Sequence, residues 1–355
     1  MLAAAGIGLP LTGNRTAAPA QIENPIGPVQ AALAGLTLEQ QIGQLFMVGL
    51  NSDAPEAVAA QTSDAITYLY AGSVVLFGGG WSSSTLISST VEPLQALAAQ
   101  ANGGAALFVS GNQEGGRWGS VQAFYGAGFS AIPSAVDQGE GDPALLQQQA
   151  QTWGTELLSA GVNLNLAPVL DTVPAGTEAA NAPIGALGRE YGSDPDTVTT
   201  YGVAFERGMH AAGVAVAIKH FPGLGRVTGN TDYTNQGIVD GQFSGIGDPY
   251  LEPYTAGINA GAEFVMISLA TYPRVDTLPA VFSSTIINGI LRSGLGFGNI
   301  VLSDDLGLAV AVADRSPADR ALGFLRAGGD MVLTVVPSDI APMASAVFDA
   351  VQADS

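Results

Sequence analysis

Short apolar runs recur along the chain from about residue 36, and most are followed by a polar or glycine-rich turn and then a helical pattern. The eight runs cover residues 44–50, 73–78, 105–111, 163–171, 214–220, 262–271, 299–305 and 331–335. They are continuous rather than alternating, as is typical of parallel strands buried on both faces. Helical patterns cover residues 143–160, 195–212, 283–295 and 340–353.

Strands that alternate with helices in this way predict an α/β protein, a (β/α)8 TIM-like barrel that occupies residues 36–355 as a single domain. A doubly wound open sheet is the alternative fold. We disfavour it because Gly72 and the glycines at 78–80 lack the spacing of the dinucleotide-binding fingerprint.

Residues 1–35 are predicted to be an N-terminal tail. Residues 1–10 are small and apolar, and residues 18–20 (Ala-Pro-Ala) resemble a signal-peptide cleavage site, although no Lys or Arg precedes the apolar stretch. A signal remnant and a flexible Ala/Gly tail both fit. Together with the acidic, cysteine-free composition, this favours a secreted or cell-envelope protein, with a cytoplasmic location as the alternative.

Composition narrows the function classes. Hydrophobic residues make up 47% of the 355 residues and charged residues 12%, which indicates a folded protein with a large core. The net charge of -20 argues against nucleic acid as a partner, because phosphates require a cationic surface. No apolar run is long enough to span a bilayer. The chain has no cysteine and two histidines, so neither thiolate nor histidine-rich metal sites are expected, and no cofactor or metal is implied.

Charged residues, although scarce, cluster where the predicted strands end. The clusters are Asn112 to Arg117 (with Glu114), Asp171, Lys219-His220, and Asp304-Asp305; the sixth strand carries Ser268. In barrels of this type the carboxyl ends of the strands hold the active site. Carboxylates and cations around one cavity suit a polyhydroxylated ligand such as a sugar.

Each cluster also has a purely structural interpretation. Glu114 and Arg117 could form an ion pair at the rim of the barrel, and Lys219 with His220 could be a satisfied pair in the core. Asp305 is better explained as a cap that accepts backbone N–H groups. Taken together, the clusters favour a binding site.

Six segments of the chain resemble the single-domain β-N-acetylglucosaminidases of glycoside hydrolase family 3. They are Leu-Glu-Gln-Gln-Ile-Gly-Gln at 38–44, Gln-Glu-Gly-Gly-Arg at 113–117, Asn-Leu-Asn-Leu-Ala-Pro-Val at 163–169, Gly-Arg-Glu-Tyr-Gly-Ser-Asp-Pro at 188–195, Lys-His-Phe-Pro-Gly at 219–223 and Leu-Ser-Asp-Asp-Leu at 302–306. The resemblance implies a TIM-like barrel and a retaining mechanism with Asp304 as nucleophile. It further implies that Arg189, Lys219 and His220 hold sugar hydroxyls, with Glu114 and Arg117 in a partly architectural role. The implied substrate is a β-linked N-acetylglucosaminyl saccharide, either a muropeptide of the cell wall or a chitin-derived oligosaccharide.

The loop after the fifth strand departs from the family pattern. Relatives carry an Asp-Ser-His dyad there as general acid/base, and this chain has Asn230 and Asp232 at the corresponding positions. Leu224 replaces another histidine of the loop. Asn112 replaces an aspartate that accepts bonds from the sugar, which loses about 1 kcal/mol or more per bond. Ser268 also stands where relatives often carry histidine.

Two interpretations follow. We favour a degenerate hydrolase of the cell wall or of amino-sugar metabolism, with activity impaired or lost, that binds sugar or a protein partner. The alternative is an active retaining enzyme in which Asp232 is the acid/base, although Asp232 could also be a solvated loop residue. The active enzyme requires Asp232 to reach the pocket, about 5–5.5 Å from Asp304. The degenerate protein requires a loop that points away or a pocket filled by Trp118 or Leu224. A third class, a pure protein-interaction module, requires a large exposed apolar patch.

Overall fold

The computed structural model describes residues 28–116 and 121–354. The chain divides into two compact units, residues 1–35 and residues 36–355. Within the first, the described residues form one helix, α1 (Pro28–Ala34). The second unit holds the barrel.

Eight parallel strands of the second unit form a nearly closed barrel, which confirms the predicted fold. Neighbours follow the order β7-β6-β5-β4-β3-β2-β1-β8, and a bridge between Leu302 and Met331 brings the two edge strands together. The strands are β1 (Phe46–Asn51), β2 (Ser73–Phe77), β3 (Phe108–Gly111), β4 (Leu164–Asn165), β5 (Ala215–Phe221), β6 (Phe264–Ile267), β7 (Ile300–Ser303) and β8 (Val332–Thr334). Every strand lies within one of the predicted apolar runs or overlaps it.

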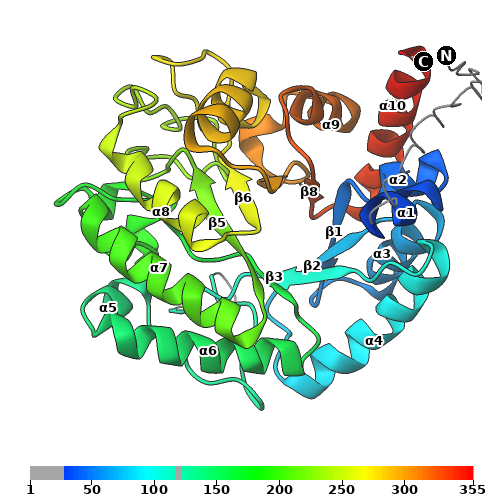
Figure 1. The fold of residues 1–355 in the computed structure, drawn as a ribbon, viewed down its shortest axis with the longest axis horizontal. Helices are drawn as coiled ribbons and strands as arrows, with labels where there is room; N and C mark the ends of the chain where they lie inside the picture. The colour runs from blue at the N-terminus through cyan, green and yellow to red at the C-terminus, as the bar shows by residue number, and fades with distance from the viewer. Residues whose placement is uncertain (1–27, 117–120, 355) are drawn as a thin grey trace, which may run out of the picture. The chain divides into compact units, whose positions relative to one another are not determined.

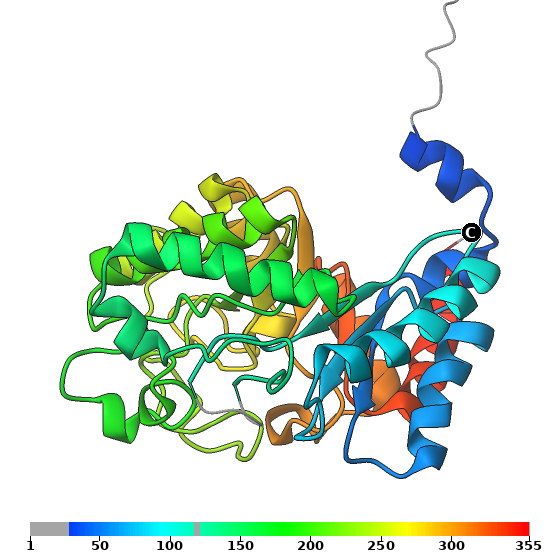
Figure 2. The same cartoon turned by 90° about the horizontal axis from the view of Figure 1, so that it is seen from below.

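Helices cover the outside of these strands. They are α2 (Leu38–Gly43), α3 (Glu56–Tyr68), α4 (Ser84–Ala101), α5 (Ala135–Gly139), α6 (Pro143–Ser159), α7 (Pro195–Ala212), α8 (Glu252–Ala260), α9 (Pro317–Arg326) and α10 (Ile340–Ala353), with a π-helical segment, η5 (Thr285–Gly294), before β7. Both ribbon views show α6 beside α7 (Figures 1 and 2). The helix α7 begins at Pro195. The preceding residue, Asp194, caps this helix, because its side chain accepts a hydrogen bond from the Thr197 amide.

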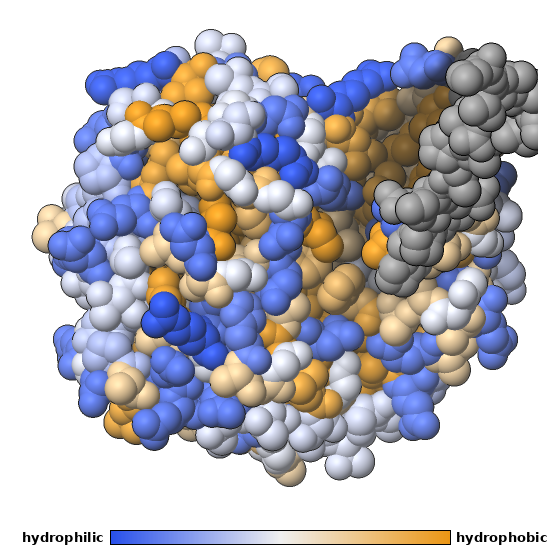
Figure 3. All heavy atoms as spheres, viewed as in Figure 1, coloured by the Kyte–Doolittle hydropathy of each residue, from blue (hydrophilic) through white to orange (hydrophobic). Residues whose placement is uncertain are grey.

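The strands read as continuous apolar runs because both of their faces are buried. Met47, Leu164, Phe264 and Leu302 belong to a small cluster of ten buried residues in the interior of the barrel. Their neighbours along the strands, such as Val265, belong to a larger cluster that includes residues of the surrounding helices. Over the face seen in Figure 3, hydrophilic and hydrophobic residues are interspersed. No helix among the described residues has both the length and the apolarity to cross a bilayer.

Candidate active site

The carboxyl ends of the strands surround a cavity of about 590 Å³, which holds most of the predicted site residues. Asn112 follows β3, Lys219 and His220 end β5, and Asp304 follows β7. Arg189 and Asp232 reach the same cavity from the loops after β4 and β5. The predicted site residues that line this cavity are Asn112, Arg189, Lys219, His220, Asp232 and Asp304. Arg117 and Trp118 lie outside the described residues.

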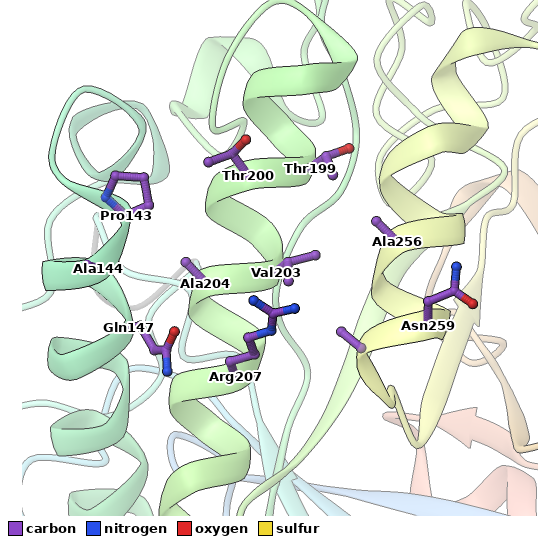
Figure 4. Close-up of a pocket in the computed structure, with 11 residues that line it drawn as sticks. Pro143, Ala144, Gln147, Thr199, Thr200, Val203, Ala204, Arg207, Ala256 and Asn259 are labelled. Atoms are coloured by element: carbon purple, nitrogen blue, oxygen red, sulfur yellow. The ribbon is translucent and has the colours of Figure 1, made fainter.

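A second hollow is similar in size but has different chemistry. It measures about 620 Å³ and lies across α6, α7 and α8 on the outside of the barrel (Figure 4). Its described lining contains one charged residue, Arg207, and none of the predicted site residues. Volume alone therefore does not identify the site, and the convergence of titratable groups does.

One wall of the cavity is built on the buried carboxylate of Glu114. The Nε and Nη2 atoms of Arg189 donate to its two oxygens, both at 2.8 Å, and Nζ of Lys219 lies 2.6 Å from Oε1. Burial by itself would raise the pKa of Glu114, but the charges and hydrogen bonds of Arg189 and Lys219 lower it to about 2. Glu114 therefore stays ionised and holds two cations at the cavity. The predicted ion pair of Glu114 with Arg117 involves a residue outside the described ranges.

Asn112 completes this wall. Its Oδ1 accepts a hydrogen bond of 3.0 Å from Nζ of Lys219, the only lysine of the chain. That contact uses one of the two lone pairs of the amide oxygen, and the Nδ2 group can donate to a ligand. Burial lowers the pKa of Lys219, and the charge of Glu114 opposes that effect. Relative to an aspartate, Asn112 therefore offers a donor to a sugar in place of a charged acceptor.

His220 pairs with Asp171 rather than with its neighbour Lys219. Its Nδ1 lies 2.7 Å from Oδ2 of Asp171. The other oxygen of Asp171, Oδ1, accepts hydrogen bonds from the hydroxyl of Tyr254 at 2.9 Å and the amide of Leu224 at 2.6 Å. Burial of Asp171 would raise its pKa, but His220 and these donors lower it. An ionised Asp171 keeps a proton on Nδ1, which leaves Nε2 of His220 as the ring atom for a ligand. The sequence pattern placed Asp171 at a strand end but did not reveal this role.

Asp304 and Asp305 perform different tasks although they are adjacent. Oδ1 of Asp304 accepts a bond of 2.8 Å from the Asp305 amide, and the side chain faces the cavity. Asp305 accepts from the backbone amides of Gly307 and Leu308, both at 2.8 Å, and of Val335 at 2.9 Å. Burial raises the pKa of Asp305, and these amides oppose that effect. Asp305 is thus a backbone cap, as the sequence suggested, but of a turn rather than of an α-helix.

Asp232 stands at the mouth of the cavity, in a turn that is held by backbone contacts. Its amide donates to Oδ1 of Asn230 at 2.9 Å, and its carbonyl accepts from the amide of Val310 at 3.2 Å. None of the described residues donates a hydrogen bond to its carboxylate. The loop therefore does not point away from the cavity, and Asn230 acts as the cap of the turn that carries Asp232.

The surroundings of Asp232 favour its protonated form. Burial among protein atoms and then the charge of Asp304 raise its pKa to about 6, with partial opposition from Arg189, His220 and Lys219. The residue is nevertheless exposed to solvent at the mouth. Water screens part of the effect while the cavity is open, and a bound ligand that excludes water would strengthen it.

Two residues that the sequence analysis did not identify anchor this loop. Nδ2 of Asn181 donates to the carbonyls of Leu224 at 2.7 Å and Val227 at 2.8 Å, while its Oδ1 accepts from the amides of Ile184 and Gly185. Asn181 thereby joins the segment that leads to Arg189 to the loop that carries Asp232. The second anchor, Arg226, contacts the Asp248 carboxylate through two bonds of 3.0 and 2.9 Å. Neither is part of a sequence motif, so only their polarity within a loop could have drawn attention to them.

Two further residues of the sequence analysis serve structural purposes or close off part of the site. Ser268 is fully buried, and its hydroxyl lies 3.0 Å from that of Tyr272. Ser268 does not line the cavity. Leu224 does line it, yet the cavity stays open. Among residues 28–116 and 121–354 there is no group of three or more side chains that could hold a metal ion.

Comparisons with known proteins agree with this geometry. The family model described as the glycosyl hydrolase family 3 N-terminal domain matches residues 37–353. A β-hexosaminidase of Stenotrophomonas maltophilia is 33% identical over 287 residues, which are 79% of this chain and 81% of the relative. The crystal structure of a β-N-acetylhexosaminidase from Beutenbergia cavernae is 47% identical with a TM-score of 0.85, over 90% of this chain and 93% of that one. A family 3 β-N-acetylglucosaminidase from Paenibacillus is 28% identical with a TM-score of 0.77, over 90% of this chain and 59% of the other.

Proposed function

Because the chain belongs to the glycosyl hydrolase family 3 N-terminal domain family, we propose that it is an active retaining β-N-acetylhexosaminidase with Asp304 as nucleophile and Asp232 as acid/base. One observation carries the proposal: both carboxylates line one cavity, and the charge of Asp304 contributes to the raised pKa of Asp232. Retaining hydrolysis requires two carboxyl groups in different environments, one that is ionised and acts as nucleophile and one that is protonated and acts as general acid. The names of the relatives support N-acetylhexosaminides as substrates.

In the first step, the carboxylate of Asp304 attacks the anomeric carbon while Asp232 donates its proton to the glycosidic oxygen. The bond to the leaving group breaks and a covalent glycosyl-enzyme forms. In the second step, the ionised Asp232 takes a proton from a water molecule, whose oxygen attacks the anomeric carbon and releases Asp304. Because Asp232 has no permanent hydrogen-bond donor among the described residues, it can alternate between its two protonation states.

The other lining residues would orient the sugar. Lys219, Arg189 and the amide of Asn112 supply donors, and Nε2 of His220 is the ring nitrogen that can bond to a sugar hydroxyl. Their partners Glu114 and Asp171 are buried behind them, with 4% and 0% of their surface exposed. This arrangement holds the donors in place before the sugar arrives, which lowers the entropic cost of binding.

A sugar-binding protein with impaired hydrolysis is the second candidate, and it is the one that the sequence alone favours. Asn112 is the structural observation in its support, since its amide oxygen already accepts a bond from Lys219 and the charge of an aspartate is missing. Against it, Asp232 reaches the cavity and Leu224 does not fill it. It stays a prediction that the barrel domain begins at residue 36. Export of the protein to the cell envelope also stays a prediction.

The direct test is hydrolysis of 4-nitrophenyl β-N-acetylglucosaminide at high enzyme concentration. We expect turnover by the wild type, near-complete loss in Asp304→Asn, and a smaller loss in Asp232→Asn, because 4-nitrophenolate needs little protonation to leave. Asp349→Asn, an exposed aspartate on α10, is the matched control. If wild type and Asp304→Asn show the same rate, hydrolysis of this sugar is absent and the binding function takes its place.

A further inference from the structure

Two exposed apolar side chains border the mouth of the cavity. Tyr233 is 80% exposed and Leu308 is 66% exposed, and both line the cavity. A single exposed apolar residue needs no explanation. These two, however, flank the proposed reacting groups: Tyr233 follows Asp232 directly, and Leu308 lies in the turn that follows Asp304.

Backbone hydrogen bonds join the two segments that carry these side chains. The segment after Asp304 bonds to the Asp232 loop through the Val310 amide and the Asp232 carbonyl at 3.2 Å, and through the Ala311 amide and the Thr231 carbonyl at 3.1 Å. The amide of Leu308 donates to Asp305 at 2.8 Å. The two exposed side chains therefore project from backbone segments that are joined and capped, so a ligand would not have to order the backbone that carries them.

The polarity of the cavity indicates which part of a substrate would contact them. The wall formed by Asn112, Arg189, Lys219 and His220 suits the hydroxyls of the sugar that is cleaved off. A general acid must lie within hydrogen-bond reach of the oxygen that joins this sugar to its leaving group. The leaving group therefore lies beside Asp232, on the side of Tyr233 and Leu308.

The charges near the mouth disfavour a negatively charged leaving group. Among the described lining residues the two cations, Arg189 and Lys219, share the carboxylate of Glu114. Arg226, at the base of the loop, is paired with Asp248. Asp304 adds negative charge, and the chain as a whole carries -20. A carboxylate on the leaving group would meet repulsion, and the described lining offers no unpaired cation to offset it.

Resting on the proposed function, we propose that Tyr233 and Leu308 form a platform for the apolar face of an uncharged leaving sugar. The preferred substrates are then neutral, chitin-type N-acetylglucosaminyl oligosaccharides rather than cell-wall saccharides whose leaving sugar carries a carboxylate. An aromatic ring supplies a large, rigid contact area for such a face, and Leu308 extends it.

The test compares three substrates that differ only in the leaving group. N,N′-diacetylchitobiose has a neutral ring, N-acetylglucosaminyl-β-1,4-N-acetylmuramic acid adds one carboxylate, and methyl β-N-acetylglucosaminide has no ring. We expect kcat/KM of the wild type to be about tenfold or more higher for chitobiose than for the muramic acid disaccharide. In Tyr233→Ala, and to a smaller extent in Leu308→Ala, the ratio of chitobiose to methyl glycoside should fall about tenfold.

Tyr68→Ala is the matched control, because Tyr68 is a 70% exposed tyrosine on α3. Equal rates on the two disaccharides, or an unchanged ratio in Tyr233→Ala, would overturn the platform. If the wild type cleaves none of the three, the proposed function fails instead. Calorimetric binding of chitobiose then decides the inference: weaker binding by Tyr233→Ala than by wild type supports the platform, and equal binding overturns it.

Discussion

Glu114 and Asp232 are two carboxylates at one cavity whose environments act in opposite directions. Glu114 is 4% exposed and has cationic donors on both oxygens, which lower its pKa to about 2. Asp232 is exposed at the mouth, has no described donor, and lies near the charge of Asp304, so its pKa rises to about 6. The comparison shows that burial alone does not decide the protonation state, since the more deeply buried group is the one that stays ionised.

The same contrast separates carboxylates that orient their neighbours from the carboxylate that is proposed to exchange protons during the reaction. Glu114 and Asp171 keep permanent partners, and their neighbours Lys219 and His220 are oriented by them. Asp232 is positioned through its backbone, while its carboxylate stays available for proton exchange. A charge with permanent partners organises a site, and a charge without them can titrate during a reaction.

Removal of the Glu114 carboxylate should have the largest effect, which is a loss of stability. In Glu114→Ala, Arg189 and Lys219 would remain buried without their counterion, and we expect the free energy of unfolding to fall by about 3–5 kcal/mol. Urea denaturation near neutral pH measures it, with the exposed Glu140→Ala as control. In the wild type this stabilisation is present above the ordinary pKa of 4.5 and is lost as the pH falls towards about 2. A Glu114→Ala protein as stable as wild type would contradict the assigned role.

A third carboxylate sharpens the comparison, because Glu206 on α7 is buried without a partner. It is 0% exposed, and neither oxygen makes a hydrogen bond with the described residues. Burial and then the charge of Glu263 raise its pKa from 4.5 to about 8, against the opposing charge of Arg207. Folding favours the protonated form of Glu206, because its pKa is higher in the folded protein than in the unfolded chain. The free energy of unfolding should therefore fall as the pH rises from 4.5 through 8. Glu206→Met should remove this loss and raise stability at pH 9 by about 3 kcal/mol. Thermal unfolding of both proteins across this pH range tests it, and parallel curves would refute it.

The raised pKa of Asp232 should appear in the pH dependence of catalysis. The first step needs a protonated Asp232, so kcat/KM for chitobiose should fall about tenfold per pH unit above about 6, or roughly 100-fold at pH 8. Asp232→Glu, if active, should move this descending limb, whereas Asp349→Asn should leave it in place. A rate that is flat from pH 5 to 8 would show that Asp232 is not the acid.

The smallest effect is expected from the link between the two loops. Asn181→Ala removes the bonds to the carbonyls of Leu224 and Val227, so the Asp232 loop loses one of its anchors. We expect kcat/KM to fall about tenfold and stability to fall by about 1–3 kcal/mol. Assays well below the unfolding temperature separate the two effects, with the exposed Asn235→Ala as control. Unchanged kinetics would show that the loop is held without Asn181.

The sequence predicted the parts of the molecule that depend on local patterns. Apolar runs marked all eight strands, and the helical pattern over residues 195–212 marked α7. Motifs at strand ends identified Asn112, Lys219, His220 and Asp304 as neighbours of one cavity. The pairing of Glu114 with Arg189, 75 residues apart, depends on tertiary contacts. The accessibility of Asp232 likewise depends on bonds to Val310 and on a turn capped by Asn230, which no local pattern reveals.

The measurement that tests the account most directly is azide rescue of Asp232→Ala with 2,4-dinitrophenyl β-N-acetylglucosaminide. This leaving group departs without protonation, so the glycosyl-enzyme on Asp304 should form and then wait for water that has lost its general base. Azide needs no base and should attack the anomeric carbon. If Asp232 is the acid/base and Asp304 the nucleophile, azide should make turnover faster and the product should be a β-glycosyl azide. No acceleration by azide, or an α-glycosyl azide, would contradict these roles.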